Sequence, residues 1–168
     1  MFRESVADRI NWLVGVSIFL VTIVVSPTTT LDPINLPKFW VLLALGLAVS
    51  LVLLTQPKEL FSKGNLQIIG SARAVFVFML LALLISNIAK SQQLFGVYGR
   101  NTGLFTYLAF GSLFVGAAVA TNRKVTKPFI IGTSTALVIN AIYGALQANG
   151  GDPFEWSNPY APVIGTLG

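Results

Sequence analysis

The sequence predicts an all-α fold, a polytopic transmembrane helical bundle with five spans and its N-terminus inside. The chain has 168 residues, of which 54% are hydrophobic and only 10% are charged, and its mean hydropathy is +0.76. Because a soluble domain carries about 25% charged residues, this composition leaves too little polar surface to face water. The apolar residues gather in five long runs, and the basic residues favour alternate segments between them.

The first apolar run covers about residues 10–25 and follows a short charged segment, Met1 to Arg9. Arg3 and Arg9 resemble the positive region of a signal peptide, but no A-x-A cleavage site follows, so we expect an uncleaved first span. The next segment, Ser26 to Lys38, contains three prolines, which predict an extended loop rather than a helix.

The later spans follow the same hydrophobic pattern. A connecting loop is expected from Gln56 to Arg73, and a tight basic turn at residues 122–127. The remaining expected spans are residues 39–54, 74–89, 104–121 and 128–148, followed by an outer-face loop at 149–168.

The orientation follows from the distribution of lysine and arginine. With the N-terminus inside, the inner segments hold eight basic residues and the outer segments hold three. The outer three are Lys38, Lys90 and Arg100. This bias predicts that the chain is a multi-pass protein of a plasma membrane, with Arg100 and the C-terminal tail on the outer face.

Small residues recur at every fourth position in two of the expected spans. The fifth span has Gly132, Ala136, Asn140, Gly144 and Ala148, and the fourth has Ser112, Gly116 and Ala120. Such stripes favour close packing between membrane helices, and Asn140 is expected to hydrogen-bond across the contact. An alternative is that Asn140 and Gln147 line a polar cavity. We expect the five spans to fold poorly alone, because the stripes would face lipid without partner helices.

The segment from Ser91 to Gly103 is the candidate functional site, because it is a polar, glycine-rich loop between two apolar runs. Its glycines permit close approach of a ligand, and a charge kept beside a bilayer, here Arg100, indicates a binding role. The alternative is an interfacial anchor in which Arg100 extends to the headgroups beside Tyr98.

Several functions are excluded or disfavoured by composition. The chain has no cysteine and no histidine, so it lacks thiol chemistry, the commonest general base and the commonest metal ligand, and we expect no metal and no cofactor. None of the six carboxylates lies within an apolar run, which disfavours a proton relay. Although the net charge is +5, the basic residues sit in short loops rather than on one face, so no nucleic-acid partner is expected.

Three stretches together carry a family resemblance. They are L-D-P-I-N-L-P-K-F-W (31–40), L-F-G-V-Y-G-R-N-T-G-L-F-T-Y-L (94–108), and Y-G-A-L-Q-A-N-G-G-D-P-F-E-W-S (143–157), with V-I-G-T-L-G at the end. In this order they resemble the N-terminal half of the bacterial O-antigen ligase / O-antigen polymerase family. The family's last motif continues into another span, so the resemblance implies a fragment or a truncated reading frame whose partners include missing downstream helices.

The resemblance implies a glycosyltransferase of the bacterial inner membrane, acting in cell-envelope polysaccharide biosynthesis. The donor would be a glycan on a polyprenyl diphosphate, and the acceptor a lipid or another glycan. Family members carry their catalytic arginine and histidine residues in a downstream outer loop, so no catalytic residue is assigned to this chain, and the chain alone is expected to be inactive. Substrate contacts are carried over to Arg100 and Lys38, with Tyr98 and Trp156 as candidate partners of the sugar or the membrane interface.

Two other functions stay open at this point. Some relatives of the family are labelled bicarbonate transporters, but a transporter should show broken helices and a polar site near the middle of the membrane. The third possibility is a non-catalytic membrane scaffold, which becomes the best interpretation if the chain is complete.

Overall fold

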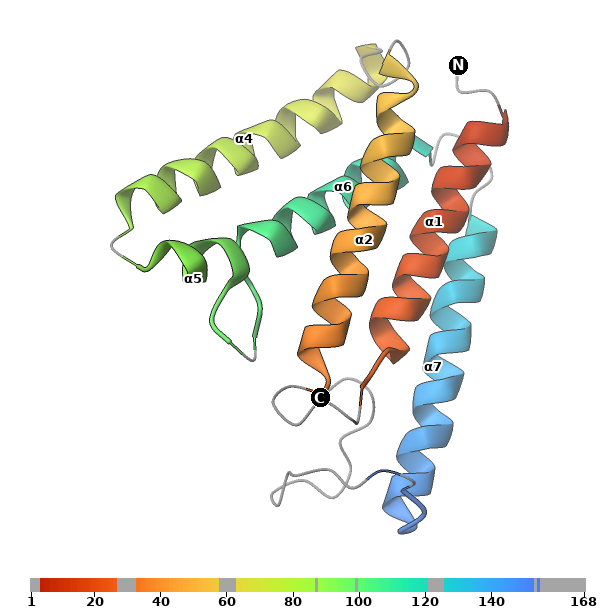
Figure 1. Ribbon diagram of the computed structural model, residues 1–168. Helices are drawn as coiled ribbons and strands as arrows, with labels where there is room; N and C mark the ends of the chain where they lie inside the picture. The colour runs from red at the N-terminus through yellow and green to blue at the C-terminus, as the bar shows by residue number, and fades with distance from the viewer. Residues whose placement is uncertain are drawn as a thin grey trace.

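The described residues of the computed structural model form six α-helices, arranged as a bundle of helices with two more strongly inclined members (Figure 1). The structure describes residues 4–26, 33–57, 63–86, 88–98, 100–120, 126–152 and 154. In chain order the helices are α1 Glu4–Ile23, α2 Asn35–Leu54, α4 Lys63–Ile85, α5 Lys90–Phe95, α6 Leu104–Ala120 and α7 Thr126–Ala148. The described part of the chain contains no strand.

Each expected apolar run lies mainly on a long helix, but α1 ends at Ile23 and α4 at Ile85, so the predicted ends at 25 and 89 are wrong. The predicted loops are also too long. The helix α2 begins at Asn35, so the prediction of an extended loop as far as Lys38 is wrong. Its proline, Pro37, lies in the first turn, where a missing N–H removes no hydrogen bond. Likewise α4 begins at Lys63, so much of the expected loop from Gln56 to Arg73 is helical. Polar residues at helix ends carry no apolar signal, which is why hydropathy misses them.

A similar correction applies to the candidate loop at Ser91 to Gly103, because its first part is the short helix α5, Lys90–Phe95. Only Gly96 to Gly103 connects α5 to α6 as a loop.

Three helices in the described ranges are long and apolar enough to cross a membrane. They are Val6–Ile23, Asn35–Leu54 and Lys127–Ala148. Two shorter apolar stretches, Ile69–Leu83 and Leu104–Ala120, lie on α4 and α6. The chain is therefore an all-helical protein of membrane type.

The core lies around α1, which packs against α7 on one side and against α2 and α6 on the other. In Figure 1, α1 and α7 run in the same direction and α2 runs in the opposite one. The buried cluster joins Ile10 and Val14 of α1 to Val49 and Leu53 of α2, and it ends on Val119 and Ala120 of α6. These side chains fill the space between three helices.

The contact between α1 and α7 is a direct approach of two backbones. A Cβ added to Gly132 would lie 2.3 Å from the carbonyl oxygen of Gly15, and one added to Gly15 would lie 2.5 Å from that of Pro128. Ala136, one turn further along α7, is buried. The small-residue stripe predicted for this helix therefore faces α1 over its first half.

The contact between α2 and α6 uses the second predicted stripe. A Cβ on Gly116 would meet the Val49 side chain at 2.6 Å. The hydroxyl of Ser50 donates a hydrogen bond of 2.8 Å to the hydroxyl of Ser112, and Ala120 is buried. Polar contacts of this kind stabilise helix association in membranes.

This chain therefore supplies partner helices for Gly132 and Ala136 of one stripe and for Gly116 and Ala120 of the other, whereas Ala148 at the end of α7 is exposed. That the five spans fold poorly alone stays a prediction. Asn140 donates to the carbonyl of Ala136 at 2.9 Å, within its own helix. A hydrogen bond from Asn140 across the helix contact stays a prediction.

The helix α4 is the least covered of the long helices, and it packs mainly on α6. Its apolar side chains are largely exposed, including Val75, Phe78 and Ile85. The ring of Phe76 lies against Gly111, where an added Cβ would come within 2.3 Å of the ring. A groove lies on this side between α2, α4 and α6.

We predict that Gly132→Ala lowers the free energy of unfolding by about 1–3 kcal/mol, because the new methyl group overpacks the α1–α7 contact. The control is Gly70→Ala on α4, where a Cβ meets nothing within 4 Å. This control should leave stability unchanged or raise it by up to about 1 kcal/mol, since alanine favours helix. SDS-induced unfolding in detergent micelles measures both, and equal losses would contradict the proposed contact.

Candidate functional site

The loop from Gly96 to Gly103 is closed at its base by contact between its own two ends. Gly96 has a positive φ of 88°, and a Cβ there would lie 2.3 Å from the backbone nitrogen of Thr102. A Cβ on Gly103 would lie 2.3 Å from the nitrogen of Gly96. At Gly96 and Gly103 the space that a side chain would fill is therefore occupied by the loop's own backbone.

The tip of this loop is a hydrogen-bonded turn. The backbone N–H groups of Arg100 and Asn101 donate to the carbonyl of Val97 at 3.0 and 2.9 Å. Asn101 has a φ of 50°, a left-handed conformation that asparagine tolerates better than most residues. The Thr106 hydroxyl, in the first turn of α6, donates to the carbonyl of Asn101. The tip is therefore tied to a helix of the bundle.

Two predicted site residues project from this turn. Arg100 is exposed, and Tyr98 is 60% exposed. An arginine and a tyrosine presented in this way suit either a charged ligand or the headgroup layer of a membrane.

Aromatic contacts connect the base of the loop to the beginning of α2. The ring of Phe95, just before the loop, lies 5.2 Å from that of Phe105, just after it. Phe95 also lies 6.3 Å from Phe39, the neighbour of Lys38 in the chain. Lys38 itself is half-buried in the first turns of α2. The structure thus brings the start of α2, with Lys38, to the base of the loop that carries Arg100.

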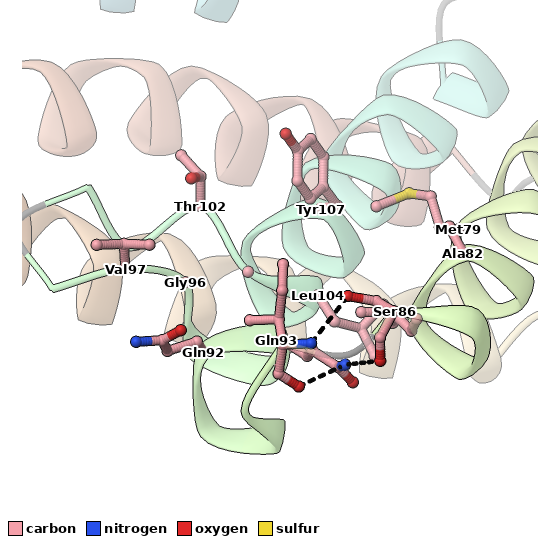
Figure 2. Close-up of a pocket in the computed structure, with 13 residues that line it drawn as sticks. Met79, Ala82, Ser86, Gln92, Gln93, Gly96, Val97, Thr102, Leu104 and Tyr107 are labelled. Atoms are coloured by element: carbon pink, nitrogen blue, oxygen red, sulfur yellow. Dashed lines mark hydrogen bonds between the residues drawn. The ribbon is translucent and has the colours of Figure 1, made fainter.

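A pocket of about 390 Å³ lies beside the loop, between the end of α4, α5 and the start of α6 (Figure 2). In Figure 2, Met79 and Ala82 of α4 and Ser86, just after α4, lie on one side of the pocket. Gln92 and Val97 lie on the other side. Most of the lining is apolar, with Tyr107 and Thr102 among its polar groups. Such a mixture fits an amphipathic molecule or part of an apolar chain.

The side chain of Gln93 connects α5 to the segment that follows α4, along one edge of the pocket. Its side-chain amide donates to the carbonyls of Ser86 and Ile88 at 3.1 and 2.9 Å, as Figure 2 shows, and the side chain is only 8% exposed. The amide oxygen accepts a 3.4 Å bond from Lys90. Gln93 therefore supplies hydrogen-bond donors to two carbonyl groups in the segment that follows α4.

A second polar cluster lies at the C-terminal end of α7. The carboxylate of Asp152 accepts hydrogen bonds from the hydroxyl of Tyr143 at 2.9 Å and the amide of Gln147 at 2.6 Å. It also accepts one from the backbone N–H of Phe154 at 3.0 Å. The buried Gln147 thus binds Asp152, which favours this contact over the alternative of a cavity lined by Gln147 and Asn140.

Gly150, with a φ of 72°, ends α7 in a left-handed cap. Its N–H and that of Gly151 return to the carbonyls of Gln147 and Leu146 at 3.0 and 2.8 Å. These bonds bring Asp152 back to the last turns of the helix, where it meets Tyr143 and Gln147. Trp156, the fourth predicted site residue, lies outside the described residues.

Sequence reasoning missed the roles of Gln93, Thr106 and Asp152, which hold the segments at helix ends by hydrogen bonds. Thr106 stands near the start of an apolar run, and its position three residues after Gly103 was a local signal for a hydroxyl that bonds back to a loop. Gln93 and Asp152 act through contacts that hydropathy does not predict.

Chemically, the arrangement offers an exposed guanidinium beside an amphipathic pocket. The described residues contain no group of three His, Cys, Asp or Glu side chains close enough to hold a metal ion. No family model, curated protein or solved structure matches this chain.

We predict that Gln93→Leu destabilises the protein by about 1–3 kcal/mol, because the two carbonyls at the end of α4 lose their donor. The control is Gln92→Leu, on the exposed neighbouring position, which should change the free energy of unfolding by less than about 0.5 kcal/mol. Thermal unfolding in detergent measures both variants. If Gln93→Leu unfolds at the same temperature as the control, the capping role is wrong.

Proposed function

We propose that this chain is the N-terminal membrane part of a glycosyltransferase similar to O-antigen ligases and polymerases. Such an enzyme moves a glycan from a polyprenyl diphosphate donor to a lipid or glycan acceptor on the outer face of the bacterial inner membrane. The observation that carries the proposal is the exposed Arg100 on a closed, hydrogen-bonded loop at one end of a bundle of apolar helices.

The donor has two chemically different parts, and the site has a counterpart for each. A guanidinium binds phosphate oxygens bidentately and keeps its charge at any physiological pH, so Arg100 suits the diphosphate. The neighbouring pocket, lined mainly by apolar groups such as Met79 and Leu104, suits the first part of an isoprenoid chain. Lys38, at the start of α2, adds a second positive charge on the same side.

The role proposed for this chain is binding rather than bond-making. The sequence contains no histidine, and the family resemblance places the catalytic arginine and histidine residues in a downstream outer loop. We therefore propose that Arg100 holds the diphosphate while residues outside this chain carry out the transfer.

The competing functions are less well supported. A transporter of the kind considered above uses interrupted helices, whereas the described spans α1, α2 and α7 are continuous. A scaffold for partner helices would use the small-residue stripes, but Gly132 and Gly116 already pack within this chain.

The proposed orientation puts all five long helices across the membrane with the N-terminus inside. Because the natural sequence lacks cysteine, single-cysteine variants test this directly. We predict that Tyr98→Cys reacts with a membrane-impermeant maleimide in spheroplasts, whose inner membrane is intact. Asp8→Cys should react only after the inner membrane is permeabilised. The reverse pattern, or equal labelling of both, would contradict the orientation.

We predict that Arg100→Ala weakens binding of geranylgeranyl diphosphate by about ten- to a hundredfold, because a charge-assisted bond to phosphate is lost. Binding to the purified chain in detergent is measured by titration calorimetry, with geranylgeraniol as the ligand that lacks the diphosphate.

Arg73→Ala is the matched control, since it removes one exposed guanidinium, from α4 rather than from the loop. It should change affinity by less than about threefold, as expected for a screened surface charge. The proposal is wrong if both variants lose affinity equally, or if the alcohol binds as tightly as the diphosphate.

A further inference from the structure

Thr106 connects the loop that carries Arg100 to the body of the protein. It lies in the first turn of α6, its side chain is 8% exposed, and its hydroxyl donates to the carbonyl of Asn101. Asn101 directly follows Arg100 in the chain, and its side chain is also 8% exposed. The bond therefore ends one residue away from the exposed guanidinium.

The helix that supplies this hydroxyl is itself firmly placed. Along α6, Ala109 lies against Gly46 and Gly116 against Val49, both on α2. A bond from Ser50 to Ser112 joins the same two helices at 2.8 Å. A group attached to the first turn of α6 is thus held relative to the core.

Without Thr106, the hydrogen bonds described for the tip would be internal to the loop. The bonds from Arg100 and Asn101 to Val97 set the shape of the turn, and the contact between Gly96 and Gly103 closes its base. Both interactions join residues of the loop to one another, whereas the Thr106 hydroxyl joins the turn to α6 beside Arg100.

We infer that Thr106 is a positioning residue, which holds the turn so that Arg100 is already placed for a phosphate group before the ligand arrives. This inference rests on the proposed function of Arg100 in diphosphate binding. A preorganised side chain binds more tightly because less conformational freedom is lost on association. Thr106 itself does not touch the ligand in this scheme.

The first test is a double-mutant cycle on binding of geranylgeranyl diphosphate by the full chain. Thr106→Val removes the hydroxyl at nearly constant volume and should weaken binding about three- to tenfold, while Thr106→Ser should restore affinity to within about twofold. In an Arg100→Ala background, Thr106→Val should have no further effect. Equal effects in both backgrounds would overturn the inference, because they would show that Thr106 acts independently of Arg100.

The second test follows the turn without any ligand. Arg100→Cys introduces the single cysteine of the chain, and a nitroxide spin label there reports local mobility. The label should give a restricted spectrum with Thr106 or Thr106→Ser, and a more mobile one with Thr106→Val. Identical spectra in all three backgrounds would overturn the inference. Circular dichroism of each variant confirms that the helices are intact.

The two tests separate the inference from the proposed function. If Arg100→Ala binds the diphosphate as the parent does, the proposed function is wrong, and the positioning of the turn is decided by the spin label alone. If Arg100→Ala loses affinity but Thr106→Val does not, the function stands and the inference is wrong.

Discussion

Because Gly15 and Gly132 have no side chains, the backbones of α1 and α7 meet directly, and this contact determines where the other helices lie. Apolar side chains gain little by leaving lipid for protein, so helix association in a membrane depends on close packing and polar contacts. With α7 on one side, α1 turns Ile10 and Val14 toward α2 and α6. The α2–α6 pair has a similar close approach, where a Cβ on Gly46 would lie 2.8 Å from the Cα of Ala109.

The loop from Gly96 to Gly103 uses glycine in a comparable way on a smaller scale. Gly96 and Gly103 bring two backbone segments together, as Gly15 and Gly132 bring two helices together. In both places the absent side chain is replaced by protein rather than by a ligand. What the loop leaves accessible is its tip, where Tyr98 and Arg100 are exposed.

Hydropathy was sufficient to predict an all-helical protein and the positions of its apolar runs, because membrane-spanning segments need long apolar stretches. It did not predict that α1 begins at Glu4 or α4 at Lys63, since polar residues in the end turns can face water without altering the helix. The helix α5 was missed for the same reason, being only six residues long and mostly polar.

The candidate site was predictable only in part. An arginine among glycines was recognisable as an exposed loop residue, and Arg100 is indeed exposed. The bond from Thr106 to Asn101 and the amide of Gln93 at the end of α4 depend on tertiary placement, which local sequence patterns do not specify. Small-residue periodicity predicted helix contacts, but not that their partners lie in the same chain.

The pairing of α1 with α7 also has a consequence for biosynthesis. These are the first and last helices in Figure 1, and membrane proteins receive their helices in the order of synthesis. The face of α1 around Gly15 is therefore exposed to lipid until α7 has been inserted. If synthesis stops before Thr126, this face stays without its partner helix.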